Sequence, residues 1–143
     1  MSNGIHFFNN KIKFVVQDKS MLKRWITEVI RDNEKIPGEI NFIITSDKVL
    51  QKINLKYLNT DTYTDIITFA LSEEQEIVSG DIYLSIERIA ENSEKYRVTL
   101  EEELRRILIH GILHLLGYDD IAANEKKKMT RLENKYLKVF SRL

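Results

Sequence analysis

One helix is marked at both of its ends in the sequence, between residues 99 and 117. Thr99 and Glu102 form the Thr-x-x-Glu pattern of a capping box, which marks a helix start. Gly117 stands where a residue in the left-handed conformation would end the helix. Between these ends the apolar residues recur at helical spacing: Leu104, Leu108, Ile112 and Leu115. We therefore expect a core helix with one side in the interior of the fold.

The same helix carries His110 and His114 near its predicted end. Residues four apart lie on one helix face, so both imidazoles can approach a single metal ion. A turn at Gly117 would let the chain return Asp120, or its neighbour Asp119, toward the two histidines. Two imidazoles and one carboxylate leave the fourth position of a zinc ion open for water, as catalytic zinc requires. The spacing predicts a zinc site formed by His110, His114 and Asp120, with Asp119 as the alternative third ligand.

The spacing of these residues also matches the metzincin proteases, in which a Glu directly after the first His serves as the general base. Here Gly111 occupies the position of that Glu, and Asp120 replaces the third His. The alternative interpretation is therefore a zinc metalloprotease-like hydrolase, although the chain lacks the Glu that would be its general base. Two histidines four residues apart also occur in helices for structural reasons alone, so the spacing needs independent support.

Composition describes an ordinary folded protein. A chain of 143 residues is long enough for one domain with a sizeable core. Hydrophobic residues make up 43% and charged residues 31%, with only five Gly and one Pro, which excludes disordered and fibrous classes. The absence of Cys excludes disulfides and thiolate zinc sites. With no membrane-length apolar run and no signal-peptide pattern, we expect a cytoplasmic protein without membrane contact.

Charge is distributed unevenly along the chain. The formal net charge is zero, which gives no overall attraction to nucleic acid. Residues 57–87 contain no Lys or Arg, whereas basic residues gather near the N-terminus. A candidate phosphate-binding face would consist of Lys11, Lys13, Lys19, Lys23 and Arg24. A solvated surface is the simpler interpretation of both segments.

Apolar patterns predict the remaining elements. Runs or alternations of β-prone residues predict strands at residues 5–8, 12–16, 40–45, 66–70 and 81–85. The first two could instead be one strand bent around residues 9 and 10. Helical spacing predicts further helices at residues 20–33, 46–58, 86–96 and 122–140. The candidate cap of the first is Ser20 or Asp18, and that of the second is Ser46 or Asp47. Pro37-Gly38 predicts a turn, and the acidic segment before residue 81 predicts a loop. We predict a single compact α+β domain over residues 1–143, in which a small mixed sheet of about four strands packs with about five helices, with the metal site at the end of a core helix.

Two separated stretches of the sequence match motifs of one protein family. Residues 110–120 read His-Gly-Ile-Leu-His-Leu-Leu-Gly-Tyr-Asp-Asp, against the family pattern His-Gly-x-x-His-Leu-x-Gly-Tyr-Asp-His. Residues 53–69 resemble its Leu-Asn-x-x-Tyr-Arg-x-x-Asp-x-x-Thr-Asp-Val-Leu-Ser-Phe, and residues 80–82 resemble a third, shorter motif. Two motifs in the right order are more specific than either alone. Over most of its length the chain resembles the YbeY endoribonucleases.

This resemblance implies a function more specific than the residues alone do. It implies a single-strand-specific, metal-dependent endoribonuclease that acts in 16S rRNA 3′-end maturation and ribosome quality control. It also implies zinc at His110, His114 and Asp120. The implied partners are the 16S rRNA precursor, the small ribosomal subunit and ribosome-assembly factors. If the metal were only structural, the chain would instead be a ribosome-assembly binding module.

Two positions depart from the family pattern. Asp120 replaces a His, and its negative charge lowers the Lewis acidity of the metal and admits harder ions such as Mn²⁺. Leu58 stands where the family has an Arg, and a Leu cannot neutralise a phosphate. Lys56, Arg105 and the basic N-terminal segment are the candidates to take over that role.

The general base is not fixed by the sequence. Because Gly111 cannot take a proton, Asp119 and Asp65 are the catalytic candidates by their positions in the motifs. Either carboxylate could equally order a turn. Three tyrosines are candidates for stacking on unpaired bases, although each could be a half-buried core residue: Tyr57, Tyr63 and Tyr118.

Overall fold

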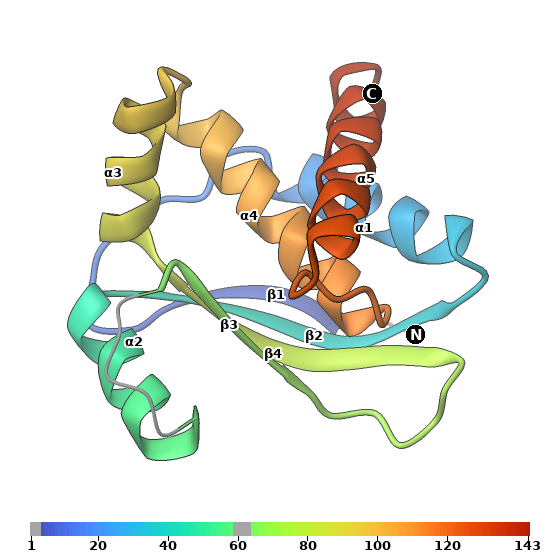
Figure 1. Cartoon of the computed structure of the whole chain (residues 1–143), viewed down its shortest axis with the longest axis horizontal. Helices are drawn as coiled ribbons and strands as arrows, with labels where there is room; N and C mark the ends of the chain where they lie inside the picture. The colour runs from blue at the N-terminus through green and yellow to red at the C-terminus, as the bar shows by residue number, and fades with distance from the viewer. Residues whose placement is uncertain (1–3, 59–63) are drawn as a thin grey trace.

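A four-stranded mixed sheet organises this computed structural model, in which residues 4–58 and 64–143 are described. The described elements are β1 (Gly4–Asn9), α1 (Lys19–Asp32), β2 (Ile36–Thr45), α2 (Asp47–Ile53), the π-helical turn η1 (Asn54–Leu58), β3 (Ile66–Ala70), β4 (Ile77–Ser85), α3 (Ile86–Tyr96), α4 (Leu100–Leu115) and α5 (Ala123–Ser141). The strand order is β1-β2-β4-β3, with β1, β2 and β4 parallel and β3 antiparallel to β4. Helices α1, α3, α4 and α5 cover one face of the sheet, and α2 lies on the other (Figure 1). The predicted α+β class is confirmed.

Helix α4 lies at the centre of the core, between the sheet and the other helices of its face. Its residues Leu108 and Ile112 are fully buried, as the apolar spacing predicts. Helix and sheet come very close at Gly111, where a Cβ atom would lie 2.9 Å from Ile66 Cδ1 and 3.1 Å from two carbons of Ile82. Position 111 therefore admits no side chain unless these strand residues move.

Both predicted ends of α4 are confirmed. The Thr99 hydroxyl accepts a hydrogen bond from the Glu102 amide, and the Glu102 carboxylate accepts one from the Thr99 amide, each at 3.1 Å. At the other end Gly117 has a φ of 102°. The amides of Gly117 and Tyr118 donate to carbonyls in the last turn of α4, which is the bonding pattern of a Schellman motif. The chain thereby turns back over the end of α4.

One strand prediction and one turn prediction are wrong. Residues 12–16 form no strand, because the chain leaves the sheet after Asn10 and only the side chains of this segment pack onto the core. Pro37-Gly38 does not end an element but lies within β2, where a bulge shifts the register between Pro37 and Ile40. A bulge accommodates a Pro, which cannot donate to the ladder.

Two helix predictions also need correction. The segment predicted as one helix over residues 46–58 begins at a Ser46 cap as expected, but it changes to π-helical bonding at Asn54. Helix α1 starts without the predicted side-chain cap, since Asp18 has a φ of 57° and its carboxylate makes no capping bond. Neither change affects the core, because the apolar face of α1 is buried as predicted.

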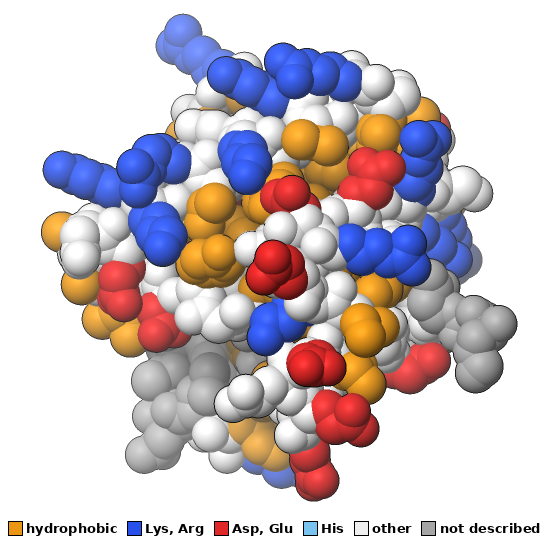
Figure 2. Space-filling model, turned by 90° about the vertical axis from the view of Figure 1, so that its right-hand side faces the viewer, with side chains coloured by type: hydrophobic (Ala, Val, Ile, Leu, Met, Phe, Trp, Pro, Cys, Tyr) orange, Lys and Arg blue, Asp and Glu red, His pale blue; other side chains and the backbone are white. Residues whose placement is uncertain are grey.

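The surface keeps the charge segregation of the sequence. Lys and Arg side chains gather in the upper part of the face shown in Figure 2, over the helices, and acidic side chains lie below them. In the N-terminal segment Lys11, Lys13, Lys19 and Arg24 are exposed. Of the helices in the described residues, none combines the length and the apolar character needed to cross a membrane.

Candidate metal centre

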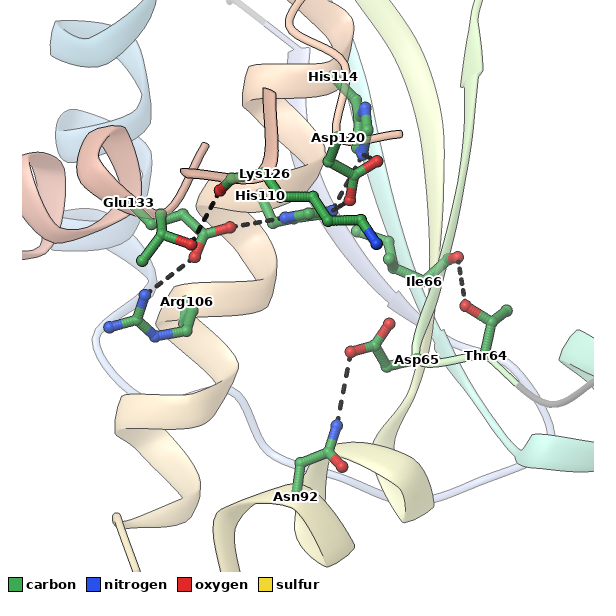
Figure 3. A network of polar contacts seen from close by, with 11 residues as sticks. Thr64, Asp65, Ile66, Asn92, Arg106, His110, His114, Asp120, Lys126 and Glu133 are labelled. Atoms are coloured by element: carbon green, nitrogen blue, oxygen red, sulfur yellow. Dashed lines mark hydrogen bonds and ion pairs between the residues drawn. The ribbon is translucent and has the colours of Figure 1, made fainter. Parts of the chain in front are cut away.

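The end of α4 and the loop after it bring three side chains together, those of His110, His114 and Asp120 (Figure 3). The Nε2 atoms of the two histidines lie 3.0 Å apart. One Asp120 carboxylate oxygen lies 3.4 Å from His110 Nε2, and the other lies 3.6 Å from His114 Nε2. The turn at Gly117 thus returns Asp120 to the histidine face of the helix.

These distances fit a small divalent ion. Ligand atoms about 2.1 Å from a tetrahedral ion are separated from one another by about 3.4 Å. Here one ligand atom from each of the three residues lies within 4.8 Å of the other two. Two ring nitrogens 3.0 Å apart also need a proton or a cation between their lone pairs. The donor set of two imidazoles and one carboxylate suits zinc and admits harder ions as well. The group could therefore hold a metal ion.

His110 makes a further contact through its second ring nitrogen. Its Nδ1 atom lies 2.6 Å from Glu133 Oε2 on α5. The other Glu133 oxygen accepts a hydrogen bond of 2.9 Å from Arg106 on α4, and the Glu133 side chain is only 9% exposed. Sequence reasoning missed Glu133. The signal that could have found it is a Glu on the apolar face of α5, between the buried Met129 and Tyr136.

The two histidines differ in their affinity for protons. Burial lowers the pKa of His110, but the hydrogen bond and the charge of Glu133 outweigh it, and the pKa is raised overall. Burial and the neighbouring His110 lower the pKa of His114 below its ordinary value. A cation bound between these rings therefore competes with protons chiefly at His110.

Of the two predicted catalytic carboxylates, only Asp65 lines the same cavity as His110 and Asp120. The cavity has a volume of about 930 Å³ and lies among α3, α4 and α5, with Asp65, His110 and Asp120 in its wall. Burial raises the pKa of Asp65, whose Oδ2 atom lies 3.5 Å from Asn92 Nδ2. Asp119 is exposed and is not part of the wall.

The loop that carries Asp120 is tied to α1 and α5 by a hydrogen-bond chain. The Tyr118 hydroxyl donates to Asn33 at 2.9 Å, and the Asn33 amide donates to the Tyr136 hydroxyl at 3.1 Å. The Tyr136 hydroxyl in turn donates to Asp32 at 2.6 Å. Burial and this bond raise the pKa of Tyr136 to about 12. Tyr118 thus acts as an anchor of the loop.

The other sequence candidates lie in different places. Tyr57 is 60% exposed on η1, and the Lys56 ammonium lies 5.1 Å from the centre of its ring. Arg105 lines the cavity, with its guanidinium 4.6 Å from the centre of the Phe140 ring. Leu58 ends η1, whereas Tyr63, with residues 59–62 of the second motif, lies outside the described residues.

Comparison with known proteins identifies a family for the chain. A sequence model described as "Endoribonuclease YbeY" matches residues 6–141. Proteins named endoribonuclease YbeY from Flavobacterium psychrophilum and Bacteroides fragilis are 44% and 45% identical to the chain. These alignments cover 93% and 94% of the chain, and 94% and 96% of the respective relatives.

A solved structure is also similar. The solution structure of TM1509 from Thermotoga maritima superimposes with a TM-score of 0.66 and 28% sequence identity, covering 95% of this chain and 88% of that one. The family match extends over nearly the whole chain and includes the segments that carry all three clustered side chains. The chain therefore belongs to the endoribonuclease YbeY family.

Proposed function

We propose that this protein is a single-strand-specific, metal-dependent endoribonuclease in which His110, His114 and Asp120 hold one zinc ion. The observation that carries the proposal is the convergence of these side chains, with contacts of 3.0, 3.4 and 3.6 Å, beside a cavity lined by His110, Asp120 and the partly buried Asp65. Membership of an endoribonuclease family supports RNA as the substrate. Because one ligand is a carboxylate, a harder ion such as Mn²⁺ is the alternative metal.

In this proposal each residue has one task. When bound, a divalent ion supplies Lewis acidity toward the scissile phosphate and toward the attacking oxygen. Asp65 accepts the proton of the attacking hydroxyl, since burial raises its pKa toward the range that suits a general base. Asp119 is the second candidate for this base, at a more exposed position. His110 and His114 use their Nε2 atoms for the ion and are not available for proton transfer.

The proposed biological role follows from the family. The substrate would be the 16S rRNA precursor, cleaved during 3′-end maturation and in ribosome quality control. The small ribosomal subunit and assembly factors would be the partners, in the cytoplasm. Proteolysis is disfavoured by a specific contact, because a Glu at position 111 would collide with Ile66 and Ile82 instead of reaching the histidines.

The test combines metal analysis with cleavage assays. Purified wild type, His114→Ala and Asp120→Ala are assayed for bound metal by elemental analysis, and then for cleavage of single-stranded RNA, duplex RNA and casein. His6→Ala is the matched control, since His6 lies on β1 outside the cavity wall. We expect about one zinc ion per chain in the wild type and the control, lost in both site variants together with cleavage of single-stranded RNA.

Other outcomes separate the alternatives. A wild type that binds no metal, even when zinc is supplied, would refute the site. Bound metal without RNA cleavage would indicate a ribosome-assembly binding module with a structural metal. Cleavage of casein that requires His114 would favour the protease.

A further inference from the structure

His110 on α4 also contacts a residue of α5 that is not one of the three clustered side chains. His110 directs Nε2 toward His114 and Asp120 and Nδ1 toward Glu133, so its two nitrogens face different neighbours (Figure 3). The Nδ1 contact of 2.6 Å is shorter than any of the three separations within the cluster. The orientation of the ring is therefore set from the side of α5.

The contact with Glu133 determines which ring nitrogen of His110 carries the proton. A neutral imidazole carries one proton, either on Nδ1 or on Nε2, and only the unprotonated nitrogen can bind a cation. A carboxylate oxygen can only accept, so Glu133 favours the form of His110 with the proton on Nδ1. That form leaves the Nε2 lone pair of His110 directed toward His114 and Asp120. The same bond increases the electron density of the ring and strengthens it as a ligand.

Glu133 is itself held in place by a second charged group. Arg106 lies one helical turn before His110 on α4, and it donates to the Glu133 oxygen that does not face the imidazole. Its other terminal nitrogen donates to Asn134 at 2.8 Å. A nearly buried carboxylate needs such compensation, because an unpaired charge in this position is costly. Both oxygens of Glu133 are thus engaged, one on each side.

We propose that Glu133, fixed by Arg106, is a positioning residue that sets the tautomer of His110 and thereby the affinity of the centre for its metal. This inference rests on the proposed function, since it concerns the same site. It assigns to α5 a role in metal binding although α5 provides none of the three clustered side chains.

The test compares a variant that alters the contact between His110 and Glu133 with a variant that leaves this contact intact. Glu133→Gln keeps the size of the side chain but removes its charge, and Asn134→Ala is the control, because it removes the other acceptor of Arg106. Zinc affinity is measured by competition with a chromophoric chelator. We expect Glu133→Gln to bind zinc about 10–100-fold more weakly than the wild type, and Asn134→Ala to bind it with wild-type affinity.

A second measurement needs no variant. Long-range proton–nitrogen NMR of the metal-free wild type, at a pH where His110 is neutral, reports which ring nitrogen carries the proton. We expect the proton of His110 on Nδ1, the nitrogen that faces Glu133. Unchanged zinc affinity in Glu133→Gln, or a His110 proton on Nε2, would overturn the inference. Wild-type protein without zinc affinity would instead refute the proposed function.

Discussion

The two helices that meet at the candidate metal centre are held in the molecule by different forces. Helix α4 is fixed by apolar packing, with Leu108, Ile109, Ile112 and Leu113 fully buried and Gly111 against the sheet. Helix α5 is amphipathic, and much of its attachment is polar: Glu133 bonds His110 and Arg106, and Tyr136 bonds Asp32. Changes in the apolar face of α4 should therefore appear mainly as lost stability, and changes in the polar contacts of α5 as altered metal affinity or altered pH dependence of stability.

The largest effect is expected from Gly111→Glu on α4. The new side chain would collide with Ile66 and Ile82 and would bury a charge, so we expect a loss of about 3 kcal/mol or more in the free energy of unfolding. Urea unfolding measures this loss, with the exposed Lys127→Glu on α5 as the control, for which we expect a change within about 0.5 kcal/mol. A stable Gly111→Glu protein that digests casein would contradict both the packing argument and the proposed nuclease.

The next largest effect is expected from Asp65→Asn, which changes a residue of the cavity wall that lies on neither α4 nor α5. Cleavage of single-stranded RNA should fall by about 100-fold or more, because the proposed base is lost. Burial raises the pKa of Asp65, so the folded state binds its proton more tightly than the unfolded chain does. Stability of the wild type therefore falls as pH rises from the ordinary value of 3.8 through the raised pKa. Asp65→Asn should thus be more stable than the wild type at neutral pH and equally stable in acid, which thermal unfolding across pH would reveal.

Tyr136→Phe tests the polar attachment of α5. Loss of the bond to Asp32 should cost about 1 kcal/mol at neutral pH. The Tyr136 hydroxyl lowers the pKa of Asp32, so this contribution is present above 3.8 and disappears as pH falls through the lowered pKa. The gap in stability between Tyr136→Phe and wild type should accordingly narrow in acid. A difference in stability that stays constant down to low pH would assign the effect to packing or to the bond with Asn33 instead of the bond with Asp32.

The smallest effect is expected at the start of α5. Ala122 occupies the N-cap position without a side-chain acceptor, while Glu125 already accepts from the Ala122 amide at 2.9 Å. Ala122→Ser would complete a capping box and should add about 0.5–1 kcal/mol to the free energy of unfolding. Ala123→Ser, one position inside the helix, is the matched control and should give no such gain. Equal effects of the two substitutions would show that capping is not the cause.

The contrast between α4 and α5 also explains which parts of the fold and of the site could be predicted from the sequence. Both ends of α4 and the proximity of its histidines to Asp120 depend on residues within one helical turn or one loop of each other, which local patterns record. Glu133 meets His110 only through the packing of two helices, and no spacing predicts that contact. The bulge at Pro37 has a similar origin, because the ladder with β4 overrides the turn preference of Pro-Gly.

The bond between His110 and Glu133 also has a consequence for protein synthesis. The two residues are separated by 23 positions, and chains grow from the N-terminus at about 5–20 residues per second. A nascent chain therefore contains His110 for about one to five seconds before Glu133 has been added. During that interval the imidazole has no carboxylate from α5 to select its protonated nitrogen. If Glu133 positions His110 as proposed, the centre is complete only after α5 has docked, and a chain that lacks α5 is expected to bind zinc weakly.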